Sequence, residues 1–495
     1  MHVAVIGAYG SAGAAVAEGL YPHVGGRIDR LTLVDDGEPG GGLCILEGCM
    51  PSKELISAAT HRHQGRVDER LTGEPHGLDL ERIVEEKNDR TRGWASHRRE
   101  SIHDMAADED VEFLHDRARF RGDQTIEVDG QTIEADYVVI ATGSVPNIPD
   151  IPGLEEAGYY TSKDTLHATE LPESAIILGF GYVGLEMAPY LSEAGVDITV
   201  IEHDERPIDE ADPEFGDTLL DIYREEFNIE VHTAVREKWV EETDDGVRLH
   251  LRNETDDEDE DEDWLGSDDA EIDSIRTDGA DVPEPVEAES IFCFTGRQPN
   301  LDGLGLENTT LSPEDGWIDA TMRPPNAEQT FVVGDANGRE PILHVAKEQG
   351  YKTAENVLAH ARGKPIEPYD NIHHHVIFSG AAIYPFARVG HTPRSAVEAG
   401  HAIATATRRA SDDGVFKSKD VPHGLARLVV DATDGTVLGW QGLHYHADVM
   451  AKTFQLAVEM ELDVREIPDR AYHPTTPEIL DGLVRECAAQ VHAEE

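Results

Sequence analysis

Residues 2–20 read HVAVIGAYGSAGAAVAEGL, and a second copy of the same pattern begins at Ala175. In the first copy the apolar strand 2–6 runs into a glycine-rich turn, and the helical stretch 14–20 follows. In the second copy the strand 176–178 leads into the turn GFGYVG at 179–184 and another helix. A strand, a glycine-rich turn and a helix begin a βαβ unit that binds a dinucleotide. The repeat therefore predicts an α/β fold with two dinucleotide-binding domains.

The glycines of these turns let the backbone approach a pyrophosphate, which the N-terminus of the following helix attracts. The predicted binding glycines are Gly7, Gly10 and Gly13 in the first turn and Gly179, Gly181 and Gly184 in the second. The first turn has one extra residue before its second glycine, compared with the usual spacing.

An acidic residue follows the second strand of each unit. Asp35 comes after the strand 31–34, and Glu202 comes after the strand 198–201. A carboxylate at this position accepts hydrogen bonds from a ribose. Because Glu202 would repel the 2′-phosphate of NADPH, the sequence favours NAD(H) over NADP(H), although Arg206 lies nearby.

A close cysteine pair stands in the segment GGLCILEGCMPSK at 41–53. Cys44 and Cys49 are five residues apart, which on a regular helix is about 7.5 Å of rise. A disulfide usually spans about 4.4–6.8 Å between Cα atoms, so a bonded pair requires a distorted segment. The chain has only four cysteines, which favours redox chemistry over a disulfide-stapled secreted fold. An inert buried pair is the alternative, and no zinc-ligand spacing is present, so we expect no metal site.

A possible acid/base stands near the C-terminus in the segment HPTTPE at 473–478. Thiol–disulfide exchange needs a base that makes a thiolate and an acid that protonates the leaving sulfur, and histidine suits both tasks. His473 is the candidate, with Glu478 placed to orient its imidazole. The run His373–His375 is expected to lie at the surface because adjacent strand residues point to opposite faces. Cys487 is expected to be a core residue of a helix.

The charge balance is strongly acidic, with 100 Asp and Glu against 41 Lys and Arg and a formal net charge of −59. Such a chain repels nucleic acid and anionic membranes, so neither is an expected partner. The acids are spread over the whole chain, which favours solvation in a salt-rich, halophilic cytoplasm over an acidic docking role. No long apolar run or secretory signal stands in the sequence, so we expect a cytoplasmic protein.

The chain divides into four predicted segments. They are a dinucleotide-binding part at 1–152, a nucleotide-binding domain at 153–289 with an acidic insertion at 253–285, a further part at 290–365, and a C-terminal domain at 366–495. The insertion is read as a solvated loop because its acidic run 256–263 cannot bury a core. After residue 335 the pattern of strands 425–430 and 437–442 and helix 447–460 predicts an α+β domain.

At these motifs the chain resembles the pyridine nucleotide-disulfide oxidoreductase family, which includes dihydrolipoyl dehydrogenase, glutathione reductase and mercuric reductase. The segment 41–53 is similar to the family's GGTCxNxGCxPSK, with Leu43 and Leu46 in place of its usual Thr and Asn. The other matching stretches are ATGSVPNIPDIPG at 141–153, GFGYVGLE at 179–186, TGRQPN at 295–300, VGDA at 333–336 and HPTTPE at 473–478.

The resemblance implies a role for each matching residue. Cys49 would face the flavin of FAD, Cys44 would attack the substrate, and His473 with Glu478 would act on the disulfide of the other subunit of a homodimer. Lys53 would lie near the flavin and pair with Glu186. The remaining implied contacts are Gly42, Thr142, Gly143, Gly334, Asp335 and Asp35 for FAD, and Gly296 with Glu202 for NAD. The family resemblance also implies that 1–152 and 290–365 form an FAD-binding domain and that 366–495 is a dimerisation domain.

The resemblance predicts an FAD-dependent NAD(P)H:disulfide oxidoreductase, and Glu202 favours a dihydrolipoyl dehydrogenase-like role with a lipoyl or other small disulfide substrate. The main alternative is a reductase of a low-molecular-weight thiol disulfide, of the bis-γ-glutamylcystine or glutathione type. Mercuric reductase, a transhydrogenase and a non-catalytic flavoprotein are less favoured.

Overall fold

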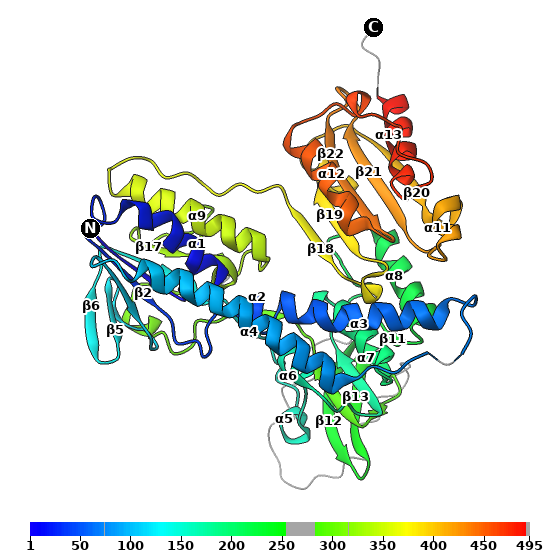
Figure 1. Cartoon of the computed structure of the whole chain (residues 1–495), viewed down its shortest axis with the longest axis horizontal. Coiled ribbons are helices and arrows are strands. Elements are labelled where there is room, and N and C mark those ends of the chain that lie inside the picture. Colours follow the sequence, from blue (N-terminus) through cyan, green and yellow to red (C-terminus); the bar gives the residue numbers. More distant parts are fainter. Residues whose placement is uncertain (74, 254–282, 315, 492–495) are drawn as a thin grey trace. The chain divides into compact units, whose positions relative to one another are not determined.

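The computed structural model describes residues 1–73, 75–253, 283–314 and 316–491 (Figure 1). Contacts within the chain divide it into two compact units. Unit 1 holds residues 1–55, 79–147 and 297–375, and unit 2 holds residues 56–78, 148–296 and 376–495. Most of the predicted acidic insertion lies outside the described residues, and the four predicted segment boundaries stay predictions.

A five-stranded parallel sheet forms the core of unit 1. Its strands, in spatial order, are β17 (Thr330–Val332), β7 (Tyr137–Ile140), β1 (His2–Ile6), β2 (Arg30–Val34) and β3 (Val111–Leu114). These strands are short apolar runs with almost no exposed positions, as expected for a parallel sheet covered on both faces. Their carboxyl ends meet at one edge, where ligands bind in such sheets.

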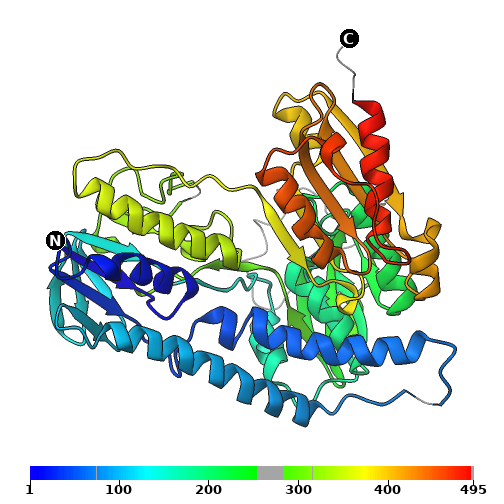
Figure 2. The same ribbon diagram turned by 45° about the horizontal axis from the view of Figure 1, so that its top comes forward.

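Helices cover the sheet of unit 1, and two of them pack unusually closely. A Cβ added to Gly350 of α9 would lie 2.6 Å from the Ala12 carbonyl oxygen in α1, and one added to Gly19 of α1 would lie 2.7 Å from Ala354 Cβ. Both figures show α1 and α9 side by side (Figures 1 and 2). The helices and short turns are α1 (Ser11–Leu20), η1 (Tyr21–His23), α2 (Leu43–Leu46), α3 (Cys49–Val67, continuing into unit 2), α4 (Leu80–Met105), η4 (Leu306–Asn308), η5 (Gly334–Asn337) and α9 (Leu343–His360).

Two small sheets complete unit 1. They are β4 (Arg119–Gly122), β5 (Thr125–Val128) and β6 (Gln131–Glu134), which pair antiparallel, and β8 (Ser144–Pro146) with β16 (Arg297–Pro299).

The first part of unit 2 repeats the parallel architecture. Its sheet has the order β11 (Glu230–His232), β10 (Asp197–Ile201), β9 (Ser174–Leu178) and β15 (Ser290–Cys293). An antiparallel sheet of β12 (Val235–Thr243), β13 (Gly246–Asn253) and β14 (Val286–Ala288) joins it. The helices are α5 (Leu154–Ala157), α6 (Ser162–His167), α7 (Tyr182–Glu193) and α8 (Pro213–Glu226).

The C-terminal part of unit 2 is a five-stranded sheet with helices. Its order is β18 (His374–Ile377), β19 (Phe386–Gly390), β22 (Val437–Leu443), β21 (Leu425–Asp431) and β20 (Ile403–Arg409), and the last four strands pair antiparallel. The helices and turns are η6 (Gly380–Ala382), α10 (Pro393–Glu398), η7 (Ala410–Asp412), α11 (Gly414–Ser418), α12 (Ala447–Glu459), η8 (Val464–Glu466) and α13 (Glu478–Gln490). The predicted α/β fold with a C-terminal α+β region is thus confirmed.

No helix within the described residues combines the length and the apolar character that crossing a bilayer requires.

Candidate active site

A break in the helix brings the two cysteines together. Cys44 lies in α2, which ends at Leu46, and Cys49 is the first residue of α3. Gly48 in the break approaches Cys44 so closely that an added Cβ would lie 3.2 Å from its Cα and 3.0 Å from the Leu43 carbonyl oxygen. The distortion expected from the five-residue spacing is therefore present, and a side chain at position 48 would oppose it.

The two thiols interact and are not joined in a disulfide. A hydrogen bond with Cys49, together with burial, raises the pKa of the half-buried Cys44 thiol, while Cys49 is exposed. An exposed Cys49 disfavours the alternative of an inert buried pair. A thiol with a raised pKa needs a base or a nearby cation before it can act as a nucleophile.

The redox segment is packed directly onto the first dinucleotide turn. A Cβ added to Gly42, at φ +82°, would lie 3.0 Å from both Gly10 Cα and the Tyr9 carbonyl oxygen. This contact places Gly42 between the cysteine helix and the turn that the sequence assigned to FAD. Position 42 requires glycine because its φ is positive and because the backbone of Tyr9 and Gly10 leaves no room for a Cβ.

Both glycine-rich turns are built in the same way. A Cβ on Gly13 would lie 2.1 Å from the Gly7 carbonyl oxygen, and one on Gly184 would lie 2.3 Å from the Gly179 carbonyl oxygen. Helices α1 and α7 can therefore lie against their strands only because these positions lack side chains. The extra residue of the first turn is accommodated by a second amide, since Gly7 N and Ala8 N both donate to the Val34 carbonyl oxygen.

The two predicted ribose acids hold equivalent places. Asp35 accepts the Tyr9 amide at 2.8 Å, and Glu202 accepts the Phe180 amide at 2.6 Å. Each acid also accepts the amide two residues further along the chain, at 2.8 Å for Asp35 and 3.0 Å for Glu202. Burial raises the pKa of Asp35 in spite of these bonds. The acids thus fix the glycine turns, and their contact with a ribose stays a prediction.

The predicted FAD residues of unit 1 gather at the carboxyl edge of its parallel sheet. Gly7 follows β1, Asp35 follows β2, Thr142 and Gly143 follow β7, and Gly334 with Asp335 follows β17. The Thr142 hydroxyl is buried without a hydrogen-bond partner among the described residues, and α1 begins at Gly10 without a side-chain cap. An unsatisfied hydroxyl and an uncapped helix N-terminus at one edge fit a bound dinucleotide such as FAD.

Ser144 and Arg297 also lie at this edge, and neither was identified as a site residue from the sequence. Asp335 accepts a hydrogen bond from the Ser144 hydroxyl at 2.6 Å, and Arg297 Nε donates to the same hydroxyl at 2.8 Å. Burial lowers the pKa of Arg297. The signal that could have found Arg297 is its place in the TGRQPN motif of a chain with few basic residues.

The predicted NAD residues gather at the corresponding edge in unit 2. Gly179 follows β9, Glu202 follows β10 and Gly296 lies shortly after β15. Helix α7 begins at Gly181 without a side-chain cap, and a Cβ added to Gly181 would meet no atom within 4 Å. This open approach to an uncapped helix is suited to a pyrophosphate.

His473 and Glu478 form a direct pair. His473 Nδ1 lies 3.0 Å from Glu478 Oε2, and the side chain of His473 is 80% exposed. Glu478 begins α13 and also accepts the Thr475 amide at 2.8 Å, and its hydrogen bond with His473 lowers the pKa of the carboxyl. With Nδ1 oriented by the carboxylate, Nε2 has no partner among the described residues and faces outward.

Lys53 and Glu186 lie in different units, so their predicted pairing stays a prediction. Lys53 Nζ donates to Ser52 Oγ at 3.3 Å, and Glu186 Oε1 accepts the Phe378 amide at 3.1 Å. The other two cysteines are buried, and burial raises the pKa values of Cys293 and Cys487 to about 12.

The histidine run splits between two neighbours. His373 Nδ1 lies 2.9 Å from Glu340 and its Nε2 lies 2.9 Å from His375 Nδ1, whereas His374 stacks on His344 at 4.0 Å between ring centroids. Strand alternation separates the rings, as expected, but His375 is buried and not at the surface.

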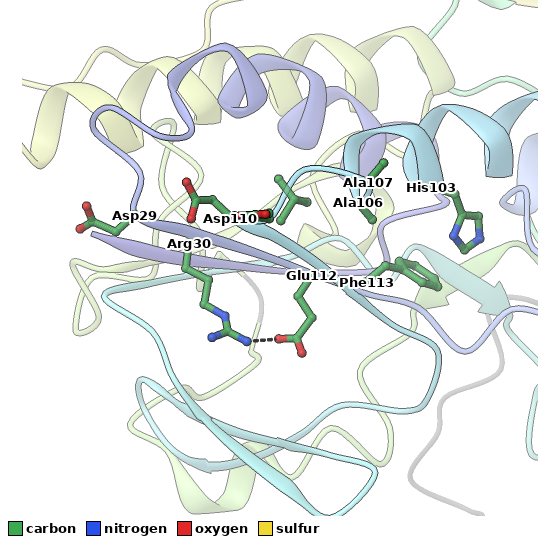
Figure 3. Close-up of a pocket in the computed structure, with 10 residues that line it drawn as sticks. Asp29, Arg30, His103, Ala106, Ala107, Asp110, Glu112 and Phe113 are labelled. Atoms are coloured by element: carbon green, nitrogen blue, oxygen red, sulfur yellow. Dashed lines mark hydrogen bonds and ion pairs between the residues drawn. The ribbon is translucent and has the colours of Figure 1, made fainter.

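A pocket of about 670 Å³ in unit 1 holds none of the motif residues (Figure 3). It is lined by four acids, and its arginine, Arg30, is paired with Glu112 at 2.6 Å. Its acidic lining suits neither a phosphate nor a disulfide with carboxylates.

Comparison with known proteins gives matches over most of the chain. Residues 1–350 match the family model described as pyridine nucleotide-disulphide oxidoreductase, and residues 376–483 match the dimerisation domain of the same family. A mercuric reductase of Streptomyces lividans is 29% identical over 94% of this chain and 92% of its own length. Dihydrolipoyl dehydrogenase 2 of Haloarcula marismortui is 28% identical over 95% of this chain and 93% of its own.

A solved structure has the same fold. The HOCl-induced flavoprotein disulfide reductase RclA of Escherichia coli superposes with a TM-score of 0.78 over 98% of this chain and 99% of its own, at 21% identity.

Proposed function

Because the chain belongs to the pyridine nucleotide-disulphide oxidoreductase family, we propose that it is an FAD-dependent NAD(P)H:disulfide oxidoreductase that works through Cys44 and Cys49. The observation that carries the proposal is the pair of interacting thiols at the start of α3, in a segment packed onto the first dinucleotide turn. A disulfide exchange centre needs two thiols within bonding reach and access for a substrate.

The chain's own residues supply the thiol chemistry. The Cys44 thiolate attacks one sulfur of a substrate disulfide, and the other sulfur leaves as a thiol with a proton from His473. Cys49 then attacks the Cys44 sulfur, which releases the second substrate thiol and re-forms the Cys44–Cys49 disulfide. Bound FAD would supply the two electrons that reduce this disulfide, drawn as a hydride from the nicotinamide.

The charges around Glu202 support NAD(H) as the nicotinamide substrate. Glu202 stands at the ribose position, and Asp204 and Glu205 add two further carboxylates close by in sequence. Arg206 is bound to Asp217 at 2.6 Å and to Glu205 at 2.9 Å, so its charge is already matched by two acids. A 2′-phosphate would therefore meet repulsion, and Arg206, the cation nearest to Glu202 in sequence among the described arginines and lysines, is already paired.

Dihydrolipoyl compounds are the first substrates that we propose, because relatives over most of the chain include dihydrolipoyl dehydrogenases of Haloferax volcanii and Haloarcula marismortui. A low-molecular-weight thiol disulfide is the alternative. Mercuric reduction is less favoured, since Cys487, the cysteine nearest the C-terminus, is single and buried.

The experiment is a substrate panel on the flavin-loaded enzyme in molar KCl. It compares dihydrolipoamide with NAD⁺, then lipoamide, glutathione disulfide and bis-γ-glutamylcystine with NADH and with NADPH. Turnover that disappears in Cys44→Ser and Cys49→Ser supports the proposal. Turnover that survives in Cys44→Ser indicates a transhydrogenase or oxidase, and the absence of a flavin band near 450 nm argues for a different function.

The exposed His473–Glu478 pair supports a homodimer in which each histidine serves the cysteines of the other subunit, consistent with the dimerisation-domain match. Heterodimers of Cys49→Ser with His473→Gln then hold one intact site of two, so a statistical mixture of the two inactive variants should recover about a quarter of wild-type turnover. A mixture that stays as inactive as its parents would place His473 and the cysteines in the same subunit's site.

A further inference from the structure

The long helix α4 packs against the redox segment and carries a run of basic residues. A Cβ added to Gly41 would lie 2.7 Å from Ala95 Cβ in α4. One turn further along, Arg99 donates to the carbonyl oxygens of Pro39 and Gly40. Residues 87–99 hold five Lys or Arg and one Asp in a chain where acids outnumber these bases by more than two to one. This local positive charge lies on the helix that contacts the cysteine segment.

Arg98 differs from the other arginines of this run, which bind an acid or, for Arg99, two backbone carbonyl oxygens. Arg90 is paired with Glu54 and Glu86, and Arg92 lies 3.6 Å from Asp89. Arg98 is half-buried, and it forms no ion pair or hydrogen bond within the part of the chain that the structure describes. Arg98 follows Ala95 by three residues and so lies on the face of α4 that contacts Gly41. Its charge there favours the Cys44 thiolate and opposes the effects of Cys49 and burial on the pKa. A half-buried guanidinium with five donors is strongly disposed to bind an anion.

The surface beside Arg98 is polar and includes both charges. The Tyr351 hydroxyl of α9 donates a hydrogen bond to the Glu18 carboxylate, which raises the pKa of Tyr351, and the charge of Arg98 lowers this pKa. Lys347 Nζ lies 5.9 Å from the centre of the Tyr351 ring. Because the Tyr351 hydroxyl donates to Glu18, part of the hydrogen-bonding capacity of this carboxylate is already used, and no ion pair joins Glu18 to Arg98 within the described residues. All of these residues belong to unit 1, on α1, α4 and α9.

We propose that Arg98 binds a carboxylate of the disulfide substrate beside Cys44, so that the enzyme prefers anionic disulfides to neutral ones of the same shape. This inference rests on the proposed function and narrows its substrate class. A guanidinium–carboxylate contact is charge-assisted and directional, so it would both attract the disulfide and fix which sulfur faces Cys44. A purely thiolate-stabilising Arg98 would instead act equally on neutral and anionic substrates.

Lipoate and lipoamide test this distinction, because they share one disulfide ring and differ only in carboxylate against amide. We expect Arg98→Gln to lower the ratio of kcat/KM for lipoate over lipoamide by about tenfold, mainly through KM. Arg98→Lys should restore part of the ratio, and Arg92→Gln, which removes one charge elsewhere on α4, should leave it unchanged. An equal loss for both substrates, or no loss, would overturn the proposal.

A second measurement does not depend on turnover. In protein reduced with dithiothreitol and carrying Cys49→Ser, alkylation of Cys44 by iodoacetate and by iodoacetamide is followed by peptide mass. We expect Arg98→Gln to lower the iodoacetate-to-iodoacetamide rate ratio several-fold, again with Arg92→Gln as control. If no disulfide is turned over but this ratio falls, the proposed function fails and the anion site stands. A ratio that does not change with Arg98 removes the anion site.

Discussion

At the scale of single residues, a buried carboxylate holds three cations together in unit 2. Glu193 of α7 has a side chain that is 1% exposed, and it accepts from Arg62, from Arg66 at 2.6 Å and from His63 at 2.9 Å. The other ring nitrogen of His63 lies 3.2 Å from Glu226 of α8. Since each ring nitrogen faces a carboxylate, His63 satisfies both contacts only as the imidazolium.

This cluster predicts a pH window for stability. Burial alone would lower the pKa of His63, but its hydrogen bonds to Glu193 and Glu226 outweigh burial and raise it. The contribution of His63 is therefore complete below the unfolded pKa of about 6.5 and is lost as pH rises through the folded value. For the carboxyls of Glu193 and Glu226, burial raises the pKa, but hydrogen bonds outweigh burial and lower it to about 2. Their contribution to the free energy of unfolding is therefore lost as pH falls towards 2.

We expect the melting temperature of the wild type to fall more steeply between pH 7 and 10 than that of His63→Gln, measured by scanning calorimetry at constant KCl. Glu86→Gln, which alters an exposed pair on α4, serves as control and should parallel the wild type. Identical slopes for wild type and His63→Gln would mean that His63 is neutral in the folded protein.

At the scale of elements, the two strand–turn–helix units share one geometry but are proposed to bind different dinucleotides. Substitution of the third glycine in each turn can distinguish the two binding sites. A Cβ added to Gly13 would lie 2.1 Å from the Gly7 carbonyl oxygen, and one added to Gly184 would lie 2.3 Å from the Gly179 carbonyl oxygen. Such overlap forces the helix away from its strand at a cost of about 1–3 kcal/mol.

We expect Gly13→Ala to lose most of its flavin absorbance, and Gly184→Ala to keep the flavin while the Kd for NADH rises about tenfold or more. Flavin content and NADH titration measure the two effects separately. Gly93→Ala, on a helix position with nothing within 4 Å of the added Cβ, should bind both ligands normally and gain up to about 1 kcal/mol of stability. Equal loss of flavin in both turn variants would contradict separate sites.

At the scale of the whole molecule, the net charge of −59 sets the conditions for folding. Many ion pairs of the protein are exposed to solvent, and exposed ion pairs contribute little to stability. Self-repulsion between acids therefore has to be reduced by the solvent, and the Debye length falls from about 10 Å at 0.1 M salt to about 3 Å at 1 M.

We expect the melting temperature to rise steeply between 0.1 M and 2 M KCl, as measured by flavin-independent circular dichroism. Sucrose at matched osmolality, which does not screen charge, should give a smaller rise. A melting temperature independent of KCl would show that the acids do not destabilise the folded chain.

The sequence by itself determined the repeated α/β architecture and the identity of the motif residues. Strand–glycine–helix patterns are local, so the two βαβ units and the acid Asp35 could be predicted from the pattern, whereas Thr142 and Asp335 were implied by the family resemblance. The spacing of Cys44 and Cys49 also implied a distorted helix, because the rise per residue is fixed.

Only the tertiary structure decided the features that depend on contacts between distant segments. The ties of Asp35 and Glu202 to their turn amides, the Arg297–Ser144–Asp335 chain and the unmatched Arg98 beside Cys44 join residues that are far apart along the chain. Their pairing follows from packing and from which charges find partners. In a chain with this many acids, the sequence could not show that Arg98 has no acidic partner within the described residues.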